Sequence, residues 1–162
     1  MEFDEMMKGL GESLGIADFK PNADGSYGIS LDGTVITFVA RQGAGLLDVV
    51  ARLCDFPEDG KAGDVLCRTL LAAMAPEDND EVYSFFLAEE DASVCLRRTL
   101  VLAAMDVKGL ESVVEGFSET LTEWRRTVGD FLADFDAVAD DLADVSVEAV
   151  VRGPTSGDFL QI

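Results

Sequence analysis

Residues 27–56 constrain the fold more than any other part of the chain. Every second residue from Tyr27 to Leu31 is apolar, which is the two-residue period of a half-buried strand. An Asp-Gly pair follows at once and suits the tight turn of a hairpin, and residues 34–40 are mostly β-branched or aromatic, as strands favour. We therefore predict a three-stranded antiparallel meander. Its third strand, residues 46–56, is ambiguous, because its apolar residues also suit a helix.

Further elements surround this meander in the sequence. Residues 2–16 carry one apolar stripe, which predicts a short amphipathic helix. Residues 64–75 predict a second helix that is apolar on more than one face, so it must be covered on two sides. Residues 82–88 form a strand that is apolar on both faces, and residues 94–102 form the next strand. A helix covered on two sides favours a dimer, with the sheet on one side and a second copy on the other.

The last part of the chain has a different period. From residue 107 to residue 145 apolar residues recur at steps of three and four, with acidic residues between them. This spacing predicts a long helix that can bend or break near Gly129, with its first half covering the sheet. We thus expect one α+β domain over residues 1–145, with an antiparallel sheet and the order helix, three strands, helix, two strands, long helix. Residues 146–162 contain a Gly-Pro pair and predict a mobile tail.

Charge limits the partners that the chain can bind. It has 12 Lys and Arg against 32 Asp and Glu, a net charge of −20. Nucleic acids and anionic membranes bind through Lys and Arg, so both are disfavoured. The acidic first residues are unlike a signal peptide, and no apolar run is long enough to cross a bilayer. We expect a cytoplasmic protein with a basic or amphipathic protein partner.

The residues needed for common catalytic sites are missing. The chain has no histidine, which removes Ser-His and Cys-His nucleophiles and the commonest metal ligand. It has no glycine-rich phosphate loop, and its Asp-rich stretches lack the spacing of a calcium loop. Cys54, Cys67 and Cys95 are odd in number and lie in apolar segments, so we expect buried, reduced thiols. The sequence predicts no enzyme, no cofactor and no metal.

The order of these elements, with the acidity and the missing active site, resembles the class I type III secretion chaperones, the family that includes the Tir chaperone. The resemblance covers residues 2 to about 130. It rests on the short helix Phe3–Leu14, the Tyr27–Phe56 meander, the apolar helix Val65–Met74, the hairpin Val82–Leu102 and the closing helix from Val107. The closing helix and tail are longer than the family leads us to expect.

The resemblance implies a bacterial cytoplasmic homodimer that binds the N-terminal region of a secreted effector in extended form and keeps it soluble and competent for export. Strand addition and the filling of apolar pockets would provide the contacts. The implied effector-binding residues are Phe3, Met6, Met7, Leu10, Leu14, Ile29, Leu31, Ile36, Phe38, Leu47 and Val49, although alternation alone leaves open which meander face is core. The implied dimer interface is Leu66, Leu70, Met74, Val82, Tyr83, Phe85 and Leu87.

A second hypothesis is a structural or regulatory coiled-coil module that acts through the heptad pattern of residues 107–145. The two hypotheses differ on truncation near residue 130. The coiled-coil module would lose its oligomeric state, whereas the chaperone would remain dimeric.

Overall fold

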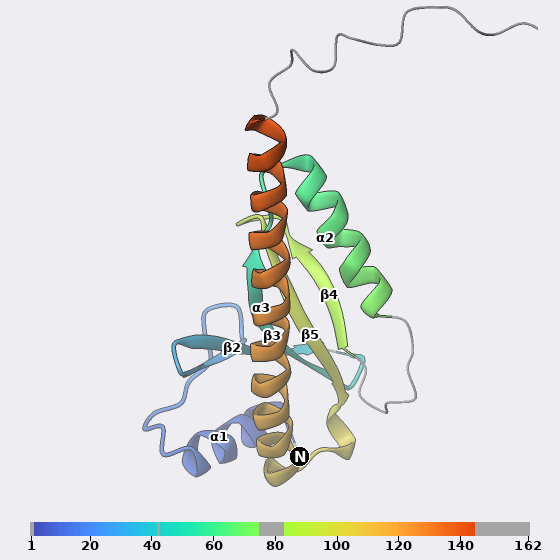
Figure 1. Cartoon of the computed structure of the whole chain (residues 1–162). Helices are drawn as coiled ribbons and strands as arrows, with labels where there is room; N and C mark the ends of the chain where they lie inside the picture. The colour runs from blue at the N-terminus through green and yellow to red at the C-terminus, as the bar shows by residue number, and fades with distance from the viewer. Residues whose placement is uncertain (1, 42, 75–82, 145–162) are drawn as a thin grey trace, which may run out of the picture. The chain divides into compact units, whose positions relative to one another are not determined.

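The structure, a computed structural model, describes the backbone of residues 2–41, 43–74 and 83–144, and side chains as far as residue 135. The elements follow the expected order. They are α1 (Phe3–Ser13), β1 (Tyr27–Leu31), β2 (Thr34–Arg41), β3 (Leu46–Asp55), α2 (Gly60–Ala73), β4 (Tyr83–Ala88), β5 (Ser93–Val101), the short 3₁₀ helix η1 (Leu102–Ala104) and α3 (Val107–Asp144). The predicted α+β class is therefore confirmed, and Figure 1 shows the elements along the chain.

The strands form one antiparallel sheet in the order β1-β2-β3-β5-β4, so β1 and β4 are its edges. The ambiguous segment is a strand, β3, which pairs with β2 on one side and β5 on the other. Tertiary pairing decides its structure, because its apolar residues suit both periods. Asp32 and Gly33 have φ angles of 49° and 78°, the left-handed values that a type I′ turn needs.

Local signals set the ends of the helices. Asp59 precedes α2, and its carboxylate accepts hydrogen bonds from the amides of Lys61 and Ala62 at 2.7 and 3.3 Å. These bonds start α2 four residues earlier than the apolar pattern predicts. Asp106 caps α3 in the same way, by accepting from the Gly109 amide at 2.7 Å. Gly15 ends the first helix in a left-handed conformation, with a φ angle of 69°.

Paired residues define the face of the sheet that forms the core. Directly opposite residues lie on the same face, and the pairing joins two rows: Tyr27, Phe38, Val49, Arg98 and Tyr83, and beside them Ile29, Ile36, Ala51, Leu96 and Phe85. Aromatic side chains from the helices pack on both rows. Phe3 contacts Tyr27 with ring centroids 5.5 Å apart, and Trp124 contacts Phe85 at 4.9 Å. We call this side the covered face.

The first part of α3 supplies much of this core. Leu110, Val114, Phe117, Leu121 and Val128 of the predicted heptad pattern are buried. The Arg125 side chain also holds α3 to the sheet, by donating to Thr34 Oγ1 at 2.5 Å and to the Arg52 carbonyl at 2.6 Å.

The chain divides into two compact units, residues 1–128 and 129–162. In the second unit α3 continues to Asp144, and the rings of Phe131 and Phe135 lie 6.4 Å apart. The helix is continuous through Gly129. The predicted domain limit at residue 145 stays a prediction, and the predicted tail, residues 146–162, lies outside the described residues.

The expectation for the thiols is only partly correct. All three cysteines are free, and Cys95 is buried, but Cys54 is half-buried and Cys67 is exposed on α2. Cys67 lies in an apolar stretch of sequence, yet on α2 it borders a solvent-accessible cavity and not the closed core.

Candidate functional site

The side of the sheet opposite the covered face carries exposed valines. We call it the open face, and its main residues are Val35, Val39, Arg41, Asp48, Thr99 and Val101. Val35 is 61% exposed and Val101 is 56% exposed, so the described helices leave this face open to solvent. Exposed valines on an unpacked sheet face can be buried by a partner.

The polar residues of the open face are bonded to one another. Asp48 is only 6% exposed, and its carboxylate accepts from Arg41 Nε and from Thr99 Oγ1, both at 2.6 Å. Arg97 donates from Nε to Ser84 Oγ at 3.1 Å and lies 5.4 Å from the Phe86 ring centroid. A partner would therefore meet a face that combines satisfied polar groups with free apolar side chains.

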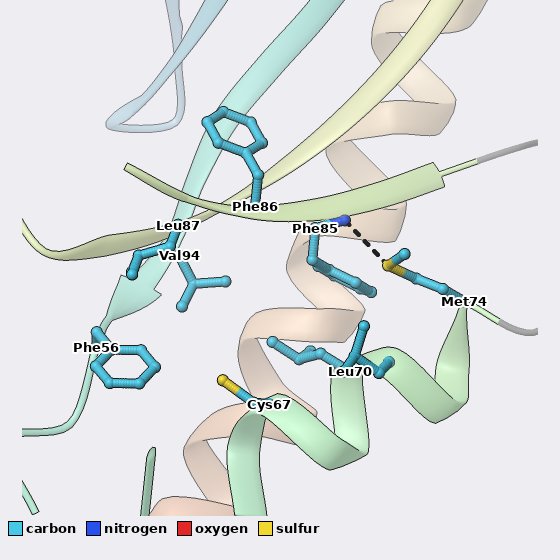
Figure 2. Close-up of a pocket in the computed structure, with 9 residues that line it drawn as sticks. Phe56, Cys67, Leu70, Met74, Phe85, Phe86, Leu87 and Val94 are labelled. Carbon is cyan, nitrogen blue, oxygen red and sulfur yellow. Dashed lines mark hydrogen bonds between the residues drawn. The ribbon is translucent and has the colours of Figure 1, made fainter. Parts of the chain in front are cut away.

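A second apolar surface lies between α2 and the edge strand β4. A cavity of about 220 Å³ is lined by Phe56, Cys67, Leu70, Leu71, Met74, Phe85, Phe86, Leu87 and Val94. Figure 2 shows Phe85 and Leu70 directed into the space between strand and helix, while Phe86 points to the other side of β4. The Phe85 amide donates to Met74 Sδ at 3.4 Å. Leu71 is 65% exposed, and Met74 and Leu87 are also exposed.

The structure shows which meander face forms the core. Of the predicted effector-binding residues, Ile29, Ile36, Phe38, Leu47 and Val49 lie on this face and are buried. Met6, Met7 and Leu10 are buried on α1. Phe3 and Leu31 are half-buried and Leu14 is exposed. The binding role of the set stays a prediction, but its buried members shape the surface from beneath. Sequence reasoning omitted Val35 and Val39, although Val35 directly precedes Ile36 and Val39 directly follows Phe38, which makes β2 apolar on both faces.

The predicted dimer residues are gathered at α2 and β4 but differ in exposure. Leu66 and Leu70 are buried, Tyr83 and Phe85 are half-buried, and Met74 and Leu87 are exposed. Val82 lies outside the described residues. The prediction omits Leu71, the most exposed large apolar residue of α2, because a helix that is apolar on two sides does not show which side faces out.

The titratable groups offer little chemistry. Burial raises the pKa of the Cys54 thiol to about 11 and also raises that of Cys95, so both favour the unreactive thiol form. Among the residues that the structure describes, no group of three or more Cys, Asp or Glu side chains is placed to hold a metal ion. The described helices also include none that is long and apolar enough to cross a bilayer.

Solved structures of other proteins share this fold. The HopA1–SchA chaperone–effector complex contains a chain with a TM-score of 0.63 and 17% identity, and the match covers 76% of this chain and 93% of that one. The Yersinia pestis type III secretion chaperone SycH, in complex with a stable fragment of YscM2, gives a TM-score of 0.54 and 16% identity over 76% and 99% of the two chains. The ExsC–ExsE complex gives 0.59 and 12% over 79% and 97%.

Sequence comparison gives the family. No curated protein sequence matches the chain. Residues 5–125, however, match the family model described as the Tir chaperone protein (CesT) family. This range extends from α1 into α3 and includes the whole sheet with both apolar surfaces. We conclude that the chain belongs to the Tir chaperone protein (CesT) family.

Proposed function

We propose that this protein is a type III secretion chaperone, which binds the N-terminal region of a secreted effector in extended form and keeps it soluble and competent for export. It would act in the bacterial cytoplasm without a cofactor. Membership of the Tir chaperone protein family supports this function. Two of the similar structures support it as well, because their names describe a chaperone with an effector and a secretion chaperone with a protein fragment.

The observation that carries the proposal is the open face. It exposes Val101 on β5 and, on β2, Val35 and Val39. The strand next to β2 is the edge strand β1, whose outer side can accept another strand. An extended effector segment can bury these valines without forming a core of its own. The net charge of −20 would keep such a half-covered sheet from aggregating before the effector binds.

The predicted effector-binding residues have different parts in this proposal. Phe3, Leu14 and Leu31 are accessible and would contact the effector at the border of α1 and β1. The buried members of the set would hold α1 and the meander in place. Binding would then depend on them through the shape of the surface rather than through contact.

We also propose a homodimer through α2 and β4. The edge strand β4, the cavity beside it and the exposed side chains of Leu71, Met74 and Leu87 lie together there. A second copy that presents the same side chains would bury apolar area that the monomer leaves in water. Leu71→Asp should give a monomer in light scattering, whereas Thr122→Asp, an exposed change on α3, should leave the dimer intact. A dimeric Leu71→Asp variant would place the interface elsewhere.

The coiled-coil hypothesis has less support, because the buried residues of the heptad pattern, from Leu110 to Val128, pack into the core of the first unit. A chain that ends near residue 130 keeps that unit. The chaperone proposal expects it to stay dimeric, and a monomeric truncated protein would favour the coiled-coil module instead.

The first experiment is affinity purification from the native cell, followed by mass spectrometry and limited proteolysis of the captured proteins. We expect a secreted protein that is protected over an N-terminal segment. The double variant Val35→Asp with Val39→Asp should lose this client, while Thr122→Asp, which adds a carboxylate elsewhere, should retain it. Capture of no secreted protein, or equal capture by both variants, would argue against the proposal.

A further inference from the structure

A groove of about 620 Å³ lies where the beginning of α1, the loop before β1 and the end of β2 meet. Its lining combines two chemistries. Glu2, Asp4 and Asp24 contribute carboxylates, while Phe3, Val39 and Leu102 contribute apolar surface. No Lys or Arg is among its described lining residues. The groove therefore differs from the α2–β4 cavity, whose described lining is apolar.

The backbone of β2 faces this groove. Pairing between β1 and β2 begins at Tyr27 and Phe38, but β2 continues to Arg41 and so extends beyond the start of β1. In an antiparallel hairpin with a two-residue turn, the pair that closes the turn and every second pair after it exchange hydrogen bonds. In β2 this series runs Thr34, Ile36, Phe38 and Ala40. The N–H and C=O of Ala40 therefore point to the same side of β2 as β1, at a position that β1 does not reach because it begins only at Tyr27.

The chain before β1 turns away from that position. The Asn22 amide donates to the Ser26 carbonyl at 2.7 Å, which closes a turn instead of extending β1. A main-chain donor and acceptor thus remain beside the carboxylates. An extended peptide needs such a pair of groups to continue a sheet, so this backbone edge indicates a peptide ligand independently of the charge.

The charge of the groove remains negative when its local contacts are counted. Hydrogen bonds from the Ser26 hydroxyl and amide, at 2.7 and 3.0 Å, lower the pKa of Asp24 and keep it ionised. Asp4 accepts from Tyr27 Oη at 3.2 Å, and Glu2 makes no side-chain capping bond. The beginning of α1 contributes roughly half a positive charge against these carboxylates. Lys20, next to the lining residue Pro21, already pairs with Asp18 at 3.3 Å.

We propose that this groove binds an extended peptide segment in which Lys or Arg alternates with apolar residues. The apolar side chains lie against Phe3, Val39 and Leu102, the basic side chains reach Asp4 and Asp24, and the peptide backbone pairs with Ala40. This inference rests on the proposed chaperone function. It adds to that function the chemical character of one segment of the effector. An acidic segment is excluded from the groove by repulsion.

The test is fluorescence anisotropy of the full-length protein with three labelled peptides of about ten residues, which span roughly 33 Å when extended. Each peptide alternates valine with one other residue: lysine, serine or glutamate. We expect the lysine peptide to bind most tightly, at least about tenfold more tightly than the glutamate peptide. Its affinity should fall as the salt concentration rises from about 0.05 M to about 0.5 M. Bound peptide should also slow hydrogen exchange at the Ala40 amide.

Charge variants locate the site. The double variant Asp4→Asn with Asp24→Asn should lower the affinity for the lysine peptide about fivefold to tenfold, since each exposed ion pair contributes up to about fivefold in affinity. The control, Glu58→Gln with Asp64→Asn, removes the same charge from exposed positions near the start of α2 and should change affinity by less than about twofold. Glu2→Gln gives a milder test that leaves the Tyr27 and Ser26 contacts intact. Melting temperatures show whether each variant is folded.

In the peptide experiments, the groove inference would be overturned by equal affinity for the lysine and glutamate peptides, by an equal loss of affinity in the control variant, or by unchanged hydrogen exchange at the Ala40 amide. These results are separable from a failure of the chaperone function. If a secreted client binds the Asp4 and Asp24 variants as tightly as it binds the wild type, the groove inference fails and the chaperone stands. If the lysine peptide binds as expected but no secreted client is found, the groove stands and the proposed function fails.

Discussion

The covered face and the open face belong to the same five strands, yet they differ in composition and packing. The covered face carries Phe38, Ile36 and Leu96, which are fully buried beneath helices. The open face alternates with it residue by residue and mixes valines with an Arg41, Asp48 and Thr99 network. The difference shows that this sheet completes only one hydrophobic core by itself. Its other face is soluble because polar side chains bond to one another between the exposed valines.

The largest expected difference between the faces is in core packing. Phe38→Ala removes a fully buried ring, and we expect it to lower the free energy of unfolding by about 3–5 kcal/mol. Val39→Ala, the neighbouring residue on the open face, should change it by less than about 0.5 kcal/mol. Urea unfolding followed by the fluorescence of Trp124 measures both. A comparable loss for Val39→Ala would mean that the open face is already covered in solution.

A smaller effect is expected where helix α1 packs beside the covered face. A Cβ added at Gly11 would lie 2.6 Å from the Phe19 Cβ, and Phe19 packs on Tyr27 with ring centroids 5.1 Å apart. Gly11→Ala should destabilise the protein by about 1–3 kcal/mol through overpacking, although alanine is the better helix former by about 1 kcal/mol. Gly116→Ala on α3 meets open space and should be neutral or stabilising. If the two substitutions had the same sign, α1 would not be packed as described.

On the open face the expected effect is smaller still and comes from polar groups. Asp48→Ala removes the acceptor for Arg41 and Thr99, and we expect a loss of about 1–2 kcal/mol in unfolding free energy. Arg52→Ala breaks exposed pairs with Asp55 and Asp91 and should lose less than about 1 kcal/mol. Thermal unfolding of both variants gives the comparison. Equal losses would show that burial of Asp48 adds nothing to its network.

The smallest expected effect is the pH dependence at the end of β3. Burial raises the pKa of the Cys54 thiol from 9.0 to about 11, so the folded state holds this proton more tightly than the unfolded state. The resulting stability is fully present below pH 9 and is lost as pH rises through about 11. Because Cys54 is only half-buried, the loss should stay below about 1 kcal/mol.

Urea midpoints at pH 8 and pH 10.5, compared with those of Cys54→Ala, isolate this effect. Iodoacetamide offers a second measurement, because Cys67 is exposed and should be modified before Cys95. Modification of Cys95 first would contradict the packing of β5.

Most of the fold could be predicted from local patterns, and the site could be predicted less well. Alternation in β1, the Asp-Gly turn and the apolar period of α3 each depend on neighbouring residues, so the sequence shows them directly. The strand β3 was ambiguous, because only pairing with β2 and β5 decides between two periods that share the same apolar residues. Alternation also could not show which meander face is core. The predicted effector-binding residues of the strands are consequently on the covered face, and the prediction omits Val35.

The sequence by itself determined the order of the elements, the single sheet with a long closing helix, and the acidic charge that disfavours nucleic acid as a partner. These properties follow from composition and from periods within one segment. Only the tertiary structure decided which strand residues remain in water, that Leu71 rather than Leu66 is exposed on α2, and that Asp4, Asp24 and Ala40 line one groove. Those residues lie far apart in the chain, and their contacts depend on how helices and strands pack, which no local period records.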